Sequence, residues 1–122
     1  MTRYEKLVNA LMNLTQEGAK LPMREDEWRT RPEADSYGTV SLDFEAGQLE
    51  ADDLKQDTGY EGSADLFSRI KGGGGWRPLI EAALTEYCGP CWELNSYQYE
   101  RKTGLGHWEY TFQITDEEAG DD

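Results

Sequence analysis

The sequence contains only two cysteines and one histidine among its 122 residues. So few cysteines exclude a disulfide scaffold and indicate a reducing, cytosolic compartment. Cys88 and Cys91 lack a second Cys or His pair, so one chain cannot complete a tetrahedral zinc site. No nucleophile elbow or other local signature pairs a serine or cysteine with His107. We therefore predict no catalytic residue, no metal site and no cofactor.

Positive charge is also scarce, with 12 lysines and arginines against 25 acidic residues and a formal net charge of −13. This balance argues against direct binding to nucleic acid or to an anionic membrane surface, because both need positive charge. Three interpretations of the acidity remain open. The charge can keep a soluble protein apart by repulsion, attract a basic partner surface, or line a wall along which nucleic acid slides without sticking.

Long apolar runs are absent as well. The N-terminal sequence MTRYEKLVNALMNL is amphipathic and carries Glu5, so we expect neither a signal peptide nor a membrane span. The length fits one domain, which we place at residues 1–114. Residues 115–122 are acidic and lack apolar anchors, so we expect a disordered tail.

The N-terminal segment predicts an amphipathic helix from about Arg3 to Leu14. Thr2 and Glu5 fit the capping box, which satisfies N–H groups that lack partners in the first turn. The apolar stripe that we expect to face the core consists of Tyr4, Leu7, Val8, Leu11 and Leu14.

Four consecutive glycines, Gly72–Gly75, precede a second predicted helix. Pro78 fits its first turn, and Gly89 with Pro90 ends it. The glycines match neither the P-loop nor the Rossmann pattern, so we interpret them as a flexible linker. The apolar stripe of this helix consists of Trp76, Leu79, Ile80, Ala83, Leu84 and Tyr87.

The tetrapeptide Cys88-Gly89-Pro90-Cys91 is the one that thioredoxin-like oxidoreductases carry at their active site. Their chemistry needs the first cysteine as a thiolate at a helix N-terminus, where the dipole lowers its pKa. Here the tetrapeptide lies at the C-terminal end of the predicted helix, where the dipole favours the neutral thiol. We therefore interpret it as a helix stop.

Alternation of apolar and polar residues predicts strands at Tyr37–Phe44, Tyr60–Phe67 and His107–Ile114. A further strand, Cys91–Tyr99, is joined to the last one by a turn within Glu100–Gly106. This order of elements predicts an α+β fold, with two helices packed on one face of a mainly antiparallel sheet.

The remaining segments have weaker patterns. Ala19–Trp28 is ambiguous and contains Pro22, and we expect a short edge strand within it that leads to Trp28, followed by a loop at Thr30–Asp35. Glu45–Gln48 is predicted to turn the chain. The polar segment Leu49–Thr58 then forms either an exposed hairpin arm or a mobile loop.

Together these segments resemble the small tail terminator, or tail completion, proteins of long-tailed phages and prophages. The resemblance extends from about Tyr4 to Ile114 and is carried by YEKLVNAL, YGTVSLDF, ADDLKQ, YEGSADLF, WRPLIEAAL and SYQYERKTGLGHWEYTFQI. It implies a non-catalytic structural protein that forms a ring, commonly a hexamer, which caps the tail tube and joins it to the head. The implied partners are further copies of the chain, tail-tube proteins and head-connector proteins. The implied location is the virion tail, after assembly in the cytoplasm of a bacterial host.

The polar arm, Leu49–Thr58, and the basic turn within Glu100–Gly106 are the predicted subunit or tube interface. The arm is long enough to reach a neighbouring subunit or the tube, although a solvated hairpin is an equal interpretation. A different class of function stays open, a small acidic inhibitor or DNA mimic that binds a basic nucleic-acid-binding host protein. A DNA mimic would need carboxylates along one face at the spacing of phosphates, whereas the carboxylates of this chain are spread over every segment. The predicted interface residues are Glu50, Asp52, Asp53, Lys55, Asp57, Arg101 and Lys102.

Overall fold

A computed structural model describes the backbone of residues 2–48 and 57–117 and the side chains of residues 2–42 and 60–115. Its elements are α1 (Arg3–Met12), β1 (Thr15–Gln16), β2 (Ala19–Lys20), β3 (Met23–Glu25), β4 (Ser36–Gln48), β5 (Asp57–Ser68), the 3₁₀ turn η1 (Lys71–Gly73), α2 (Trp76–Cys88), β6 (Trp92–Glu100) and β7 (Leu105–Glu117).

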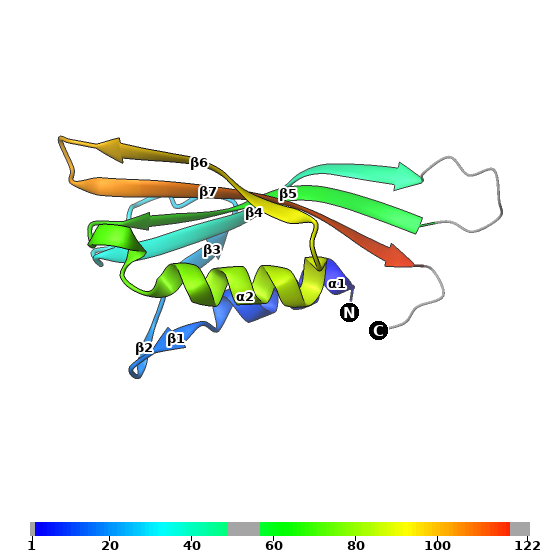
Figure 1. Ribbon diagram of the computed structural model, residues 1–122, viewed down its shortest axis with the longest axis horizontal. Coiled ribbons are helices and arrows are strands. Elements are labelled where there is room, and N and C mark those ends of the chain that lie inside the picture. The colour runs from blue at the N-terminus through cyan, green and yellow to red at the C-terminus, as the bar shows by residue number, and fades with distance from the viewer. Residues whose placement is uncertain (1, 49–56, 118–122) are drawn as a thin grey trace.

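The fold is α+β, as predicted, with both helices on one face of a five-stranded sheet (Figure 1). The strand order is β3-β4-β5-β7-β6, and β1 and β2 form a separate hairpin. The pairs β4–β5, β5–β7 and β6–β7 are antiparallel, whereas the three-residue β3 runs parallel to β4. The mainly antiparallel sheet is therefore confirmed.

Helix α1 begins where the sequence predicts. The Thr2 hydroxyl accepts a hydrogen bond from the Glu5 N–H at 3.0 Å, and the Thr2 N–H donates to the Glu5 carboxylate at 2.9 Å. The helix ends at Met12, two residues before the predicted end, because Asn13 leaves helical geometry and its side-chain amide donates to the Asn9 carbonyl at 2.7 Å. Of the predicted stripe, Tyr4, Leu7 and Leu11 are buried, and Val8 and Leu14 are half-buried.

The short edge strand predicted within Ala19–Trp28 is confirmed as β3, Met23–Glu25, which lies at one edge of the main sheet. The first residues of this segment, Ala19–Lys20, instead form a hairpin with Thr15–Gln16. Its two-residue turn is Glu17-Gly18, and both residues adopt positive φ, 50° and 80°, as such a turn requires. Pro22 then separates this hairpin from β3, and its carbonyl accepts a hydrogen bond from the Gly38 N–H at 2.8 Å. Only Met23–Glu25 joins the main sheet.

The predicted turn at Glu45–Gln48 is wrong, because β4 continues to Gln48 and pairs there with Thr58. The register shifts twice along this pair, between Leu42 and Phe44 and between Glu45 and Gly47. Such bulges absorb extra residues without ending a strand, and glycine is common at them. Most of the predicted arm, residues 49–56, lies outside the described residues, and Asp57 begins β5.

Strand β7 confirms the alternation read from the sequence, and its side chains Trp108, Tyr110, Phe112 and Ile114 join the core cluster. It runs three residues beyond the predicted Ile114, with Thr115 to Glu117 paired to the start of β5. Residues 118–122 of the predicted tail lie outside the described residues. The buried side chains of β7 are Leu105, Trp108, Tyr110, Phe112 and Ile114.

The four glycines before α2 form a defined left-handed turn, not the slack linker predicted. Their φ values are 71°, 87°, 64° and 87°, a conformation that costs an L side chain about 1–2 kcal/mol per residue. Gln16 fixes this turn by donating from its side-chain amide to the Gly74 carbonyl at 3.2 Å. At its other end α2 stops as predicted, since Gly89 takes a φ of 61° and donates its N–H to Thr85.

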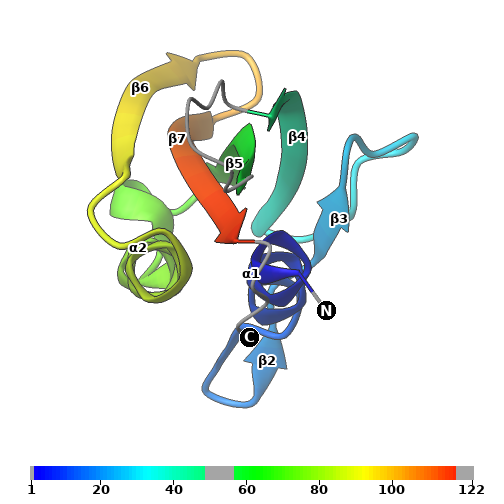
Figure 2. The same ribbon diagram turned by 90° about the vertical axis from the view of Figure 1, so that its right-hand side faces the viewer.

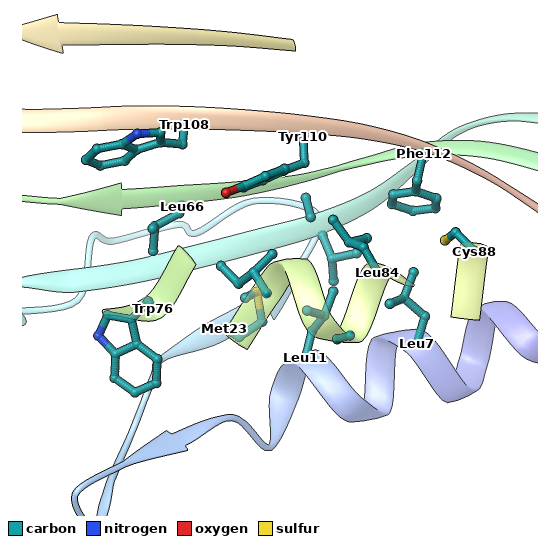
Figure 3. Close-up of a cluster of buried hydrophobic side chains, with 14 of the residues drawn as sticks. Leu7, Leu11, Met23, Leu66, Trp76, Leu84, Cys88, Trp108, Tyr110 and Phe112 are labelled. Atoms are coloured by element: carbon teal, nitrogen blue, oxygen red, sulfur yellow. The ribbon is translucent and has the colours of Figure 1, made fainter. Parts of the chain in front are cut away.

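The core lies between the two helices and the sheet (Figure 3). Leu7 from α1 and Leu84 from α2 are fully buried in the same cluster as Leu66 and Tyr110 of the sheet. Gly62 leaves room for this packing, because a Cβ at that position would lie 2.7 Å from a ring carbon of Phe112. Helices α1 and α2 share the apolar cover of the sheet, with α2 packed on β6 and β7 and α1 packed on β3 and β7.

Candidate interaction surface

Of the predicted interface residues, the structure describes Asp57, Arg101 and Lys102, and it does not bring Asp57 together with the other two. Asp57 pairs with Glu117 at one end of the sheet, whereas Arg101 and Lys102 are exposed in the β6–β7 turn at the other end (Figure 1). The 13 residues of β7 connect these ends, a span of roughly 40 Å for extended chain. The other four predicted residues, Glu50, Asp52, Asp53 and Lys55, lie outside the described residues.

The two cysteines have the environment predicted for a helix stop. Cys88 is the last residue of α2 and lies buried in the core, whereas Cys91 is exposed, and both thiols are free. Burial, with a smaller contribution from nearby Cys91, raises the pKa of the Cys88 thiol to about 12. Because the thiolate is the reactive form, Cys88 is not prepared for thiol chemistry near neutral pH.

His107 lies beside a carboxylate and an aromatic ring. Its Nε2 is 3.4 Å from Oδ1 of Asp65, and its ring stacks on Phe67 with centroids 4.3 Å apart. Within residues 2–48 and 57–117 no group of three or more His, Cys, Asp or Glu side chains is arranged to hold a metal ion. None of the helices in the same residues is long and apolar enough to cross a membrane.

A polar network connects α2 to β7. The Tyr110 hydroxyl donates to Oε2 of Glu81 at 2.6 Å and accepts from Nε of Arg77 at 3.0 Å. Arg77 also forms an ion pair with Glu81 at 3.1 Å. Burial, followed by the hydrogen bond to Glu81, raises the pKa of Tyr110 to about 12. These contacts fix the helix on the sheet.

Among the side chains of the sheet that the structure describes, the exposed large apolar ones lie on β6. It is the outermost strand, and β7 is its only partner among the described residues (Figure 2). We call Leu94, Tyr97 and Tyr99 the β6 apolar strip; these residues are 38%, 52% and 58% exposed. Across the β6–β7 pair they lie opposite Tyr110, Trp108 and Gly106, respectively. Because paired residues point to the same face, the strip lies on the face of the sheet that carries the core.

Helix α2 covers only the beginning of β6. Trp92 packs against Tyr110 and donates from Nε1 to the Thr85 hydroxyl at 3.0 Å, so α2 reaches this residue. Further along the strand, Tyr97 contacts Trp108 with ring centroids 4.9 Å apart but stays half exposed. The core face of the sheet therefore continues past the helix as an uncovered apolar surface.

Sequence reasoning predicted the strand but missed this surface. Tyr97 and Tyr99 alternate with Gln98 and Glu100, which is the pattern of any half-buried strand. The pattern does not reveal how far α2 extends beneath it. No protein-family model matches the sequence, and no curated protein is significantly similar to it.

Proposed function

We propose that the protein is a non-catalytic structural subunit that assembles into a ring on a phage or prophage tail tube and joins the tube to the head. The β6 apolar strip is the single observation that carries this proposal. An edge strand with unpaired backbone groups and exposed aromatic side chains is a surface for strand pairing or packing with another chain. A repeated copy of the chain supplies such a partner at every subunit.

The opposite edge of the sheet, β3, is less suited to contact with another subunit than β6. Strand β3 has only three residues, and Arg24 and Glu25 within it are exposed. Short, charged edges discourage pairing between chains. The nine-residue β6 has the larger open edge, so contact between subunits is expected there.

The acidic character of the chain is compatible with a ring around DNA. A formal charge of −13 per subunit repels the phosphate backbone, so DNA passes without being held. The resemblance of the YGTVSLDF, WRPLIEAAL and SYQYERKTGLGHWEYTFQI segments to tail terminators supplies the remaining support.

The test is the mass of the assembly formed by the purified protein, alone and with tail tubes. We expect rings in native mass spectrometry and electron microscopy, and about a tenfold or greater loss of assembly for Tyr99→Lys, because a charge replaces an exposed ring in the contact. Gln98→Lys is the matched control, since Gln98 is the adjacent exposed residue on the other face of β6.

A chain that stays monomeric under all these conditions contradicts the proposal. Tight binding of that monomer to a basic nuclease would support the acidic inhibitor instead. Equal assembly of Tyr99→Lys and the unmodified protein would exclude the β6 apolar strip as the contact.

A further inference from the structure

A cleft lies on the face of the sheet opposite the helices. Its volume is about 580 Å³, within the range of sites that hold a small ligand or a side chain. The segment after β3 forms one wall, and β4 and β5 form the floor. The cleft is lined by residues including Asp26, Trp28, Arg31, Tyr37, Asp65 and Phe67.

Aromatic rings make up the apolar part of the cleft. Tyr37 stacks on Phe67 with centroids 5.0 Å apart, and Trp28 packs edge-on against Tyr37 at 6.4 Å. His107 extends the row on the far side of Phe67. Stacked rings cover both faces of Phe67, and Tyr37 is buried, so the half-buried Trp28 is the ring that can receive a cation or a guanidinium.

Carboxylates predominate over cations around these rings. Asp26 and Glu27 are exposed at the rim, and Asp65 lies on the floor, against one lining cation, Arg31. Asp65 accepts a hydrogen bond from the Thr39 hydroxyl at 3.3 Å and lies 3.4 Å from Nε2 of His107. The combination of negative charge and aromatic faces fits a positively charged side chain.

The wall of the cleft is held in place before any partner arrives. Asp26 has a φ of 73°, uncommon for a residue other than glycine, and its N–H donates to the Val40 carbonyl at 2.9 Å. Trp28 donates from Nε1 to the Gly38 carbonyl at 2.9 Å. A fixed wall reduces the ordering cost of binding.

The same chain presents a suitable cationic group at the β6–β7 turn. Arg101 and Lys102 are adjacent and exposed, and within the described part of the chain neither forms an ion pair. The turn is rigid, because the Thr103 hydroxyl donates to Glu100 at 2.9 Å and Arg69 donates to the Thr103 carbonyl at 3.3 Å. In the same subunit, β7 lies between β6 and the β4–β5 floor of the cleft.

We propose that the β6–β7 turn of one subunit inserts Arg101 and Lys102 into the cleft formed by Asp26, Glu27 and Trp28 of the next subunit. The inference rests on the proposed assembly of the chain into a ring. Turn and cleft are different surfaces, so the contact is head-to-tail, the type of contact that closes into rings. It places the β6 apolar strip beside the same neighbour, since Tyr99 lies only two residues before Arg101.

Charge exchange between the two surfaces tests this contact. The turn variant is Arg101→Glu with Lys102→Glu, and the cleft variant is Asp26→Asn with Glu27→Lys, since asparagine tolerates the positive φ of Asp26. Each variant alone is expected to assemble about tenfold less than the unmodified protein, because like charges then meet. A one-to-one mixture should recover assembly, since every turn in an alternating ring meets a cleft of opposite charge.

Lys20→Glu with Lys71→Glu is the control, because it makes the same charge change at two exposed lysines outside both surfaces. Assembly of each variant at the level of the unmodified protein, or a mixture that fails to recover, would overturn the inference while leaving the ring intact. If the unmodified protein itself stays monomeric, the proposed function fails first, and the two failures are thereby distinguished. Loss of assembly in the control pair to the same extent would assign the effect to net charge and overturn the inference too.

Discussion

Burial gives the two cysteines different chemistry although only two residues separate them. Cys88 is 8% exposed and joins the core cluster at the end of α2, whereas Cys91 has left the helix and is exposed. The low dielectric around Cys88 disfavours its charged form, which is why its pKa is raised to about 12. The Cys-Gly-Pro-Cys sequence thus contains one inert thiol and one accessible thiol.

We predict that a thiol-alkylating reagent at pH 8 modifies Cys91 and leaves Cys88 unmodified in the folded protein. Alkylation needs both access and thiolate, and Cys88 has neither. Mass spectrometry of peptides from the native protein measures this, and the same reaction in urea supplies the control, where both cysteines should react. Equal modification of both in the native state would contradict the burial of Cys88 and reopen a redox interpretation.

The conformation of the four glycines before α2 is a further feature at the residue scale that the sequence did not reveal. Gly72–Gly75 are needed for four successive positive φ values, so these residues shape the entry to α2. A glycine run looks the same in sequence whether it is a loose linker or a left-handed turn. The distinction depends on contacts from elsewhere in the chain, such as the hydrogen bond from Gln16 to Gly74.

At the scale of elements, α2 is the piece that connects most of the core. It contacts α1, β6 and β7, and its buried side chains fill the space beneath the sheet (Figure 3). Leu84 at its centre is completely buried, whereas Leu79 on the same helix is only half-buried. The two leucines thus offer a comparison within one helix.

We predict that Leu84→Ala lowers the free energy of unfolding by about 2–5 kcal/mol, the range for removing a buried leucine side chain and leaving a cavity. Leu79→Ala should cost clearly less, because solvent already reaches that side chain. Urea unfolding followed by tryptophan fluorescence measures both values. A loss for Leu84→Ala no greater than for Leu79→Ala would mean that α2 does not seal the core as described.

The elements that could be predicted have both a strong period and clear ends. Helix α1 has its capping box, α2 has glycines at both ends, and β7 alternates over four apolar residues. The β1–β2 hairpin and the continuation of β4 had no such signal. The hairpin has a two-residue turn with a glutamate at positive φ, and β4 continues through two bulges. Both features depend on pairing with another strand, which the local sequence does not show.

The candidate surfaces were the least predictable part of the molecule. The β6 apolar strip exists because α2 stops short of Tyr97 and Tyr99, and the cleft exists because the chain after β3 folds over β4 and β5. Both depend on how separate elements are placed relative to one another. Of the interface residues predicted from sequence, Arg101 and Lys102 are those that the proposed head-to-tail contact uses.

At the scale of the whole molecule, two protonated groups in the interior couple stability to alkaline pH. Ordinary pKa values are 9.0 for the Cys88 thiol and 10.0 for the Tyr110 phenol, and burial raises both to about 12 in the folded protein. Below about pH 8 both groups are almost entirely protonated whether the chain is folded or unfolded, so they contribute almost nothing to the pH dependence. Between about pH 8 and 12 the unfolded chain releases these protons while the folded chain retains them. The unfolded state then binds fewer protons, and stability falls as pH rises.

We therefore predict a lower free energy of unfolding at pH 10.5 than at pH 8, measured by urea titration at fixed salt and protein concentration, because assembly shifts with concentration. Cys88→Ala should show a smaller decrease between these pH values, since one of the two groups is gone. Cys91→Ala is the matched control and should retain most of the decrease, because burial, the larger cause of the raised Cys88 pKa, is unchanged and only the smaller contribution of Cys91 is lost. Titration of surface lysines affects all three proteins alike, so the difference between the variants isolates Cys88. Identical pH dependence in the three proteins would show that the Cys88 thiol is not held protonated by the fold.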